Sequence, residues 1–225
     1  MIVLALDTAL AACSVCLFDS DRDKVLASES AILGRGHAEA LLPMLERVVA
    51  KLDGGWEGIA RIGVVVGPGS FTGLRVGIAA ARAAALATGR PAVGVTTLTA
   101  LAAPLVGISD GAPIAAAIDA KHGNLFFQVF SPEGRPLDEP AALPLEEAAF
   151  RIGERPIHLV GSGSSALQAA LSRAGGVVKS SLAEAVPDIV CVAKLAADAD
   201  PRRAPPNPLY IKGANARPLA EQASA

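Results

Sequence analysis

One stretch of the chain decides the fold: residues 67–77, which read GPGSFTGLRVG. It follows an apolar run at residues 62–66, whose length and glycine boundary predict a buried strand. It leads into residues 76–88, which are rich in alanine and predict a helix. A strand, a glycine-rich turn and a helix in this order present free backbone N–H groups at a helix N-terminus, where an anion can bind. The stretch therefore predicts a phosphate site, and its individual residues test that prediction.

The turn matches neither of two common phosphate-binding patterns. A P-loop needs Lys and then Ser or Thr after its last glycine, and Leu74 and Arg75 stand there instead. The dinucleotide pattern G-x-G-x-x-G fails because Thr72 occupies the position of the third glycine. On chemistry alone, the glycines favour a tight turn that lets the alanine-rich helix approach the sheet closely. A ligand or partner site at this turn is the alternative.

Composition limits the classes of protein. The 225 residues suffice for one large domain or two small lobes, and 52% hydrophobic residues can form a substantial core. The net charge of −2 shows no basic excess of the kind that proteins use to bind the phosphates of nucleic acids.

Cys13 and Cys16 have C-x-x-C spacing but lie in a predicted strand, which favours free thiols over a redox pair. With no basic leader and no apolar run long enough for a bilayer, we expect a cytoplasmic protein without membrane contact.

The N-terminal part of the chain alternates strands and helices. Short apolar runs predict strands at residues 2–6, 13–18, 25–30 and 91–95. Apolar residues at three- and four-residue spacing predict a helix over residues 36–51, either kinked at Pro43 or beginning near Leu42, and residues 96–105 predict another. This order is the layout of one lobe of the actin-like ATPase (ribonuclease H-like) fold, an α/β fold in which helices flank a mixed sheet.

In that fold, the first strand, its Asp-containing turn and the following hairpin hold phosphate. Asp7, Thr8 and Ser14 occupy the corresponding positions in this chain. Together with the glycine turn they form a candidate vestigial nucleotide site, whose members are Asp7, Thr8, Ser14, Gly67, Gly69 and Ser70. Residues 9–12 offer backbone donors only, so the alternative role for Asp7 is to cap its own turn.

The second half of the chain repeats the theme. An apolar strand at residues 114–118 ends in Asp119, as the first strand ends in Asp7. The pattern then predicts strands at 125–130 and 157–160, a Pro-rich surface crossing at 131–144, and helices at 146–152, 164–174 and 189–197. We therefore expect two related lobes with mixed sheets, at residues 1–106 and 107–212, followed by a disordered tail at 213–225.

The glycine-rich stretch also resembles a family signature. GPGSFTGLRVG is similar to the signature of the bacterial TsaB (YeaZ) family, a subunit of the machinery that makes threonylcarbamoyladenosine in tRNA. Residues 119–124 resemble the family's D-A-R-x-x-E-type turn, with Lys121 in place of Arg and Asn124 in place of the acid. Residues 208–212 resemble its P-x-Y-L-R element. The resemblance covers nearly the whole chain and is strongest over residues 1–106.

The resemblance implies a non-catalytic scaffold of the tRNA N6-adenosine(37) threonylcarbamoyltransferase complex. Such a subunit binds a TsaD-type catalytic subunit as a heterodimer, helps to recruit a TsaE-type ATPase, pairs with itself when alone and touches tRNA only indirectly. It binds no DNA and needs no cofactor. Its partner interface lies on two helices, which here correspond to His37, Leu41, Met44, Leu45, Phe71, Thr72, Leu74, Arg75, Ile78 and Arg82.

Catalytic groups are hard to assemble from this sequence. TsaD-type relatives hold a metal with an H-x-x-x-H pair on the first helix, and here Leu41 follows His37 at that spacing. His122 and His158 lie at unrelated spacings, and no Ser/His/Asp or Cys/His group emerges. We therefore expect no metal and no catalytic residue. Three alternatives remain: a self-sufficient actin-like ATPase or kinase using Asp7 and Thr8, a relative of the M22-type metallopeptidases, and a purely homodimeric binding module.

The interface expectation yields a first prediction. If Ile78 faces a partner, Ile78→Glu abolishes partner binding and leaves the fold intact. Light scattering of the chain with a TsaD-type subunit measures the binding, and circular dichroism measures the fold. Loss of the fold would instead place Ile78 in the core.

Overall fold

The computed structural model describes residues 1–211, and the chain divides into two compact units. The first unit is Met1–Pro104 with Glu184–Leu209, and the second is Leu105–Ala183 with Tyr210 and Ile211. The expected tail at residues 213–225 lies outside the described residues. No helix within residues 1–211 is long and apolar enough to cross a membrane.

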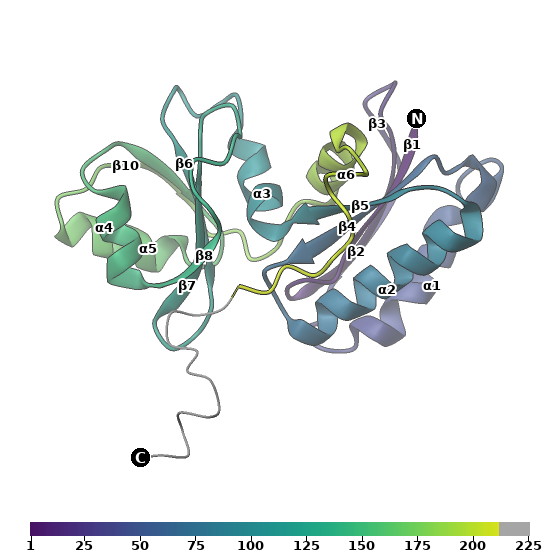
Figure 1. The fold of residues 1–225 in the computed structure, drawn as a ribbon, viewed down its shortest axis with the longest axis horizontal. Helices are drawn as coiled ribbons and strands as arrows, with labels where there is room; N and C mark the ends of the chain where they lie inside the picture. The colour runs from purple at the N-terminus through teal and green to yellow at the C-terminus, as the bar shows by residue number, and fades with distance from the viewer. Residues whose placement is uncertain (212–225) are drawn as a thin grey trace, which may run out of the picture. The chain divides into compact units, whose positions relative to one another are not determined.

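The first unit is built on a five-stranded sheet in the order β3-β2-β1-β4-β5 (Figure 1). Its strands are β1 (Ile2–Asp7), β2 (Ala12–Asp19), β3 (Lys24–Ile32), β4 (Arg61–Gly67) and β5 (Ala92–Thr96). β1, β2 and β3 are antiparallel neighbours, whereas β4 runs parallel to β1 and β5 parallel to β4. The sheet is therefore mixed, as expected.

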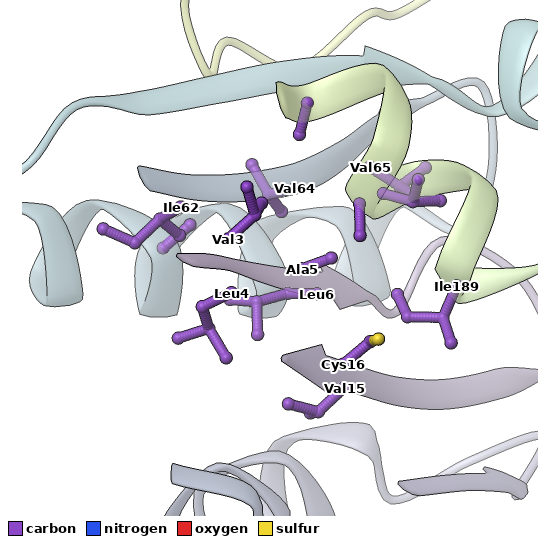
Figure 2. Packing of buried hydrophobic residues seen from close by; sticks show 14 of the residues in the cluster. Val3, Leu4, Ala5, Leu6, Val15, Cys16, Ile62, Val64, Val65 and Ile189 are labelled. Atoms are coloured by element: carbon purple, nitrogen blue, oxygen red, sulfur yellow. The ribbon is translucent and has the colours of Figure 1, made fainter. Parts of the chain in front are cut away.

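Helices cover both faces of this sheet, which explains why its central strands are continuously apolar. The helices are α1 (His37–Val49), α2 (Phe71–Thr88), α3 (Thr97–Ala102) and α6 (Ile189–Asp198), with short 3₁₀ turns at Gly55–Gly58 and Ala103–Leu105. Figure 1 shows α1 and α2 on one face and α6 on the other. Figure 2 shows buried side chains of β1, β2 and β4 in this core, with Cys16 of β2 beside Ile189 of α6. α1 runs through Pro43, so the alternative start near Leu42 is wrong.

The second unit repeats the strand order of the first. Its sheet has the order β10-β9-β6-β7-β8, with β6 (Ile114–Asp119), β7 (Asn124–Phe130), β8 (Ala141–Pro144), β9 (Ile157–Val160) and β10 (Val178–Leu182). β6 pairs antiparallel with β7 and parallel with β9, as β1 does with β2 and β4. The helices of this unit are α4 (Leu145–Ile152) and α5 (Ser164–Arg173). The predicted fold class, two related α/β lobes with mixed sheets, is confirmed.

Two strands of the second sheet were not predicted. β8 lies in the Pro-rich stretch that we expected to cross the surface, and β10 has the sequence VKSSL. Both are edge strands, and β10 is partly exposed along its length, so neither carries a clear apolar run.

The observed division differs from the expected boundary at residues 106 and 107, because Glu184–Leu209 returns to the first unit. Arg61 on β4 explains this return. Its Nη1 lies 2.9, 2.6 and 2.8 Å from the carbonyl oxygens of Ala196, Ala197 and Ala199, and so caps the end of α6. Gly63 gives α6 room, since a Cβ there would lie 2.4 Å from that of Ala196. These contacts join residues more than 130 positions apart, which local patterns do not report.

Candidate functional site

The glycine turn packs against the turn that follows β1. The Thr8 hydroxyl donates to the Gly73 carbonyl oxygen at 2.7 Å, and the Ser70 N–H donates to the Ala9 carbonyl oxygen at 2.7 Å. A Cβ at Gly73 would lie 2.1 Å from the Thr8 carbonyl oxygen, and one at Gly69 would lie 2.3 Å from that of Ala9. Both distances are far below any real contact, so the glycines are required by the close approach of two backbone segments.

This packing occupies the polar atoms of the candidate nucleotide site. Ser14 pairs with Asp7 across β1 and β2, and Gly69 and Ser70 lie against Ala9. Thr8, however, is bound to the glycine turn as described above. Ser70 caps α2 by accepting from the Gly73 N–H at 3.2 Å, and Ser14 shares a 2.7 Å hydrogen bond with Ser30. The hydroxyls that would line a phosphate pocket thus bind the protein itself. The tight-turn interpretation accounts for the geometry, and a nucleotide role for these residues stays a prediction.

Asp7 is the unusual member of this group. Its Oδ1 accepts from the Ala9 N–H at 2.8 Å, whereas Oδ2 is buried with no hydrogen-bond partner in the described chain. Burial raises the pKa of Asp7 to about 7, although the Ala9 N–H acts against the shift. Asp7 therefore caps its own turn, and its ionised form is costly in the folded protein.

The two nearby cysteines are free and buried, as predicted. Burial raises the pKa of both the Cys13 and Cys16 thiols to about 11, and the negative charge of Asp7 adds to the shift at Cys13. Because the thiolate is the reactive form, these side chains act as core residues rather than as a redox pair.

The ten residues of the predicted partner interface differ in exposure, and their role in binding a partner stays a prediction. Six of its members are buried against the chain's own sheet or at its margin, namely His37, Leu41, Met44, Leu45, Leu74 and Ile78. The other four are exposed: Phe71, Thr72, Arg75 and Arg82. Five of the buried residues belong to the hydrophobic core of the first unit, because α1 and α2 both need an apolar stripe against the sheet. Ile78 is only 4% exposed, so Ile78→Glu would damage the fold, contrary to the earlier prediction.

The outward faces of α1 and α2 present a different apolar surface. A groove of about 320 Å³ between the helices is lined by Ala38, Leu41, Leu42, Val76, Ala79, Ala80 and Ala83, and we call it the α1–α2 groove. Leu42 is 60% exposed at this groove, and a hollow of about 520 Å³ continues it toward Trp56. On the same helix α2, the Arg75 guanidinium stacks 3.7 Å over the Phe71 ring, and Arg82 donates to Asn207 at 2.6 Å.

Sequence reasoning did not place Leu42 or Ala83 at a surface, and it left open whether the stripe of α2 that contains Ala79 faces outward. The available signal was that Ala79 shares a helical stripe with Arg75 and Arg82, whose charges favour the outward side. Among residues 1–211, no cluster of three or more His, Cys, Asp or Glu side chains could hold a metal ion.

Fold and site together define a class of protein, the two-lobed α/β proteins of the actin-like type. In this chain the glycine turn packs against the turn after β1, and an apolar groove lies between α1 and α2. Comparisons with known proteins agree. A family model described as TsaD, tRNA N6-adenosine threonylcarbamoyltransferase, matches residues 31–144, just over half of the chain. The solved structure of YeaZ from Pseudomonas aeruginosa has a TM-score of 0.77 and 26% identity, over 93% of this chain and 99% of that one.

Two curated relatives are the TsaB proteins of Escherichia coli and Haemophilus influenzae. Each is 34% identical over 56% of this chain, and the match covers 54% and 52% of their respective lengths. The match thus spans about half the length of these curated relatives. The chain belongs to the TsaD family of threonylcarbamoyltransferase-related proteins and, within it, to the TsaB (YeaZ) group.

Replacing Asp7 with Asn should stabilise the protein most at alkaline pH. The pKa of Asp7 rises from an ordinary 3.8 to about 7 on folding, so the folded state binds the proton more tightly. The contribution of Asp7 to the free energy of unfolding is therefore full below pH 3.8, and it is lost as the pH rises through about 7. We expect the gain of Asp7→Asn, measured by urea unfolding, to be larger at pH 8 than at pH 5 by about 2 kcal/mol. Asp53→Asn, at an exposed site, should show no such dependence; an equal response in both variants would contradict the assignment.

The backbone contact at Gly73 predicts a sharp difference between neighbouring positions. Gly73→Ala places a methyl group on the Thr8 carbonyl oxygen and should lower the free energy of unfolding by about 2 kcal/mol or more. Thr72→Ala, one residue earlier and exposed, should change it by less than about 0.5 kcal/mol. Thermal or urea unfolding of both variants measures the difference, and similar values would refute the close-packing account.

Proposed function

We propose that the chain is a non-catalytic subunit in the biosynthesis of threonylcarbamoyladenosine at position 37 of tRNA. The names of its relatives support this role, because the curated proteins are called "tRNA threonylcarbamoyladenosine biosynthesis protein TsaB" and the family model is named for the transferase. In this proposal the chain binds and supports a TsaD-type catalytic subunit in the cytoplasm. Transfer of the threonylcarbamoyl group to adenosine takes place on that partner, which also contacts the tRNA.

The single observation that carries the proposal is the α1–α2 groove. Its floor is largely alanine, and small side chains let a partner helix approach closely, while Leu42 at 60% exposure offers an apolar anchor. Arg75 and Arg82 stand on the outward side of α2, where guanidinium groups can flank an apolar contact. A surface with an apolar centre and a charged rim is typical of a protein–protein interface.

The chemistry of the chain's own residues supports the assignment of catalysis to the partner. The glycine turn packs against the first turn of the fold, so its backbone serves the chain's own packing. Asp7, which would face a metal–nucleotide complex in an ATPase of this fold, is buried and accepts a hydrogen bond from its own turn. ATP binding by the isolated chain would favour the ATPase alternative instead.

We further propose that the same groove serves two dimers. An isolated chain would cover its apolar groove by pairing with a second copy, and the TsaD-type subunit would displace that copy because both use the same surface. Recruitment of a TsaE-type ATPase would follow formation of the heterodimer. Light scattering of the chain alone and in an equimolar mixture tests this exchange.

Leu42→Glu tests the groove directly. A charge at this exposed apolar position should weaken the complex with the TsaD-type subunit at least about 30-fold, because burial would leave the carboxylate unpaired. Calorimetric titration measures the affinity, and thermal unfolding should show an intact fold.

Phe150→Glu is the matched control, since Phe150 is 86% exposed on α4 of the other unit. It should bind the partner like the unchanged chain. Equal binding by both variants would show that the α1–α2 groove is not the interface, and failure of the unchanged chain to bind would remove the proposed function itself.

A further inference from the structure

The second unit contains a hydrogen-bonded group of Ser, His and Asp. His158 lies on β9, Ser180 on the neighbouring strand β10, and Asp110 in the segment before β6. The Nδ1 atom of His158 is 2.7 Å from the Ser180 hydroxyl oxygen. Its Nε2 atom is 2.9 Å from the Ser109 carbonyl oxygen and 3.1 Å from Oδ1 of Asp110. Both ring nitrogens are therefore engaged, one with a hydroxyl and the other with two acceptors.

These partners determine which ring nitrogen carries the proton. A backbone carbonyl and a carboxylate only accept hydrogen bonds, so Nε2 of His158 must be the donor. In the neutral ring, Nδ1 then has a free lone pair, and the Ser180 hydroxyl donates to it. A hydroxyl proton directed at an oriented imidazole, with an acceptor behind the imidazole, is the geometry of an activated nucleophile.

Neighbouring residues favour this hydrogen-bonded arrangement of Ser180, His158 and Asp110. Oδ2 of Asp110 accepts from the Lys179 ammonium at 2.6 Å, and the bonds from Lys179 and His158 hold the pKa of Asp110 below its usual range. Asp110 has a φ of 42°, a left-handed conformation that Asp tolerates better than most residues. His158 is 8% exposed, whereas Ser180 is partly exposed on an edge strand, so a reagent can reach the hydroxyl but the base is sheltered.

We propose that Ser180 is a nucleophile that accepts an acyl group from an activated carboxylic ester, with His158 as its general base and Asp110 as the positioning residue. This activity is separate from the proposed scaffold function and uses only residues of the second unit.

The reaction consumes only the ester and one water molecule. A bond forms between the Ser180 oxygen and the ester carbonyl carbon while the hydroxyl proton passes to Nδ1 of His158. The bond from that carbon to the leaving oxygen then breaks, and the alcohol departs with the proton from Nδ1. Water, activated by the same nitrogen, releases the carboxylic acid and restores Ser180.

A fluorophosphonate probe tests the nucleophile on the full-length chain. Reaction followed by peptide mapping should place the adduct on Ser180. Ser181 is the matched control, because it is the next residue of β10, has similar exposure and makes no hydrogen bond to a histidine in the described structure. Ser181→Ala should label like the unchanged chain, and Ser180→Ala should not label at this site. The absence of an adduct on Ser180 in the unchanged chain overturns the proposal.

Two further variants distinguish catalysis from a purely structural hydrogen-bond network. His158→Gln should slow labelling about 100-fold, the usual contribution of a general base. Asp110→Asn should slow both labelling and hydrolysis of p-nitrophenyl acetate, and Asp110→Glu should restore part of both rates. The Asp110 side chain is 59% exposed, so its variants should fold even if His158→Gln does not. Unchanged rates in folded His158→Gln or Asp110→Asn protein would overturn the assignment.

Discussion

The structure depends on one close approach of two backbone segments, the turn after β1 and the start of α2. Where Gly73 would carry a Cβ atom, the carbonyl oxygen of Thr8 lies 2.1 Å away, and a 2.7 Å hydrogen bond from the Thr8 hydroxyl joins the same two residues. The approach sets the distance of α2 from the sheet and determines which of its stripes is buried. Ile78 consequently packs into the core, and Ala79 and Ala83 line the groove on the outer side.

The same contact occupies the backbone and hydroxyl groups that a phosphate-binding turn of this fold would offer to a ligand. In a phosphate-binding turn, backbone N–H groups and hydroxyls remain open to the ligand. Here Ser70 binds the Gly73 N–H, Thr8 binds a carbonyl oxygen, and Asp7 is buried against its own turn. The exposed chemistry of the first unit lies instead on its helices, where an apolar groove can bind another protein.

The two units share a strand order and differ in what completes them. The first unit is completed by α6, which the chain adds after leaving the second sheet and which Arg61 caps through three carbonyl oxygens. Within residues 1–211, no such helix belongs to the second unit, and its edge strand β10 contributes Ser180 to the group around His158. A duplicated scaffold therefore presents a binding surface on one unit and a candidate nucleophile on the other.

The sequence by itself determined the fold class, most of the strands and helices, and the family, because these follow from local periodicity and from one contiguous glycine-rich stretch. It also predicted the buried free thiols correctly, since Cys13 and Cys16 lie in an apolar strand. It did not determine which stripe of α2 faces outward, because alanine is compatible with both a core and a surface and leaves the helix with a weak apolar pattern. Only the tertiary structure decided that stripe, the return of α6 to the first sheet, and the meeting of His158 with Ser180 and Asp110. Those residues are 22 and 48 positions apart, and hydrogen bonds over such separations are formed by the pairing of strands, not by spacing along the chain.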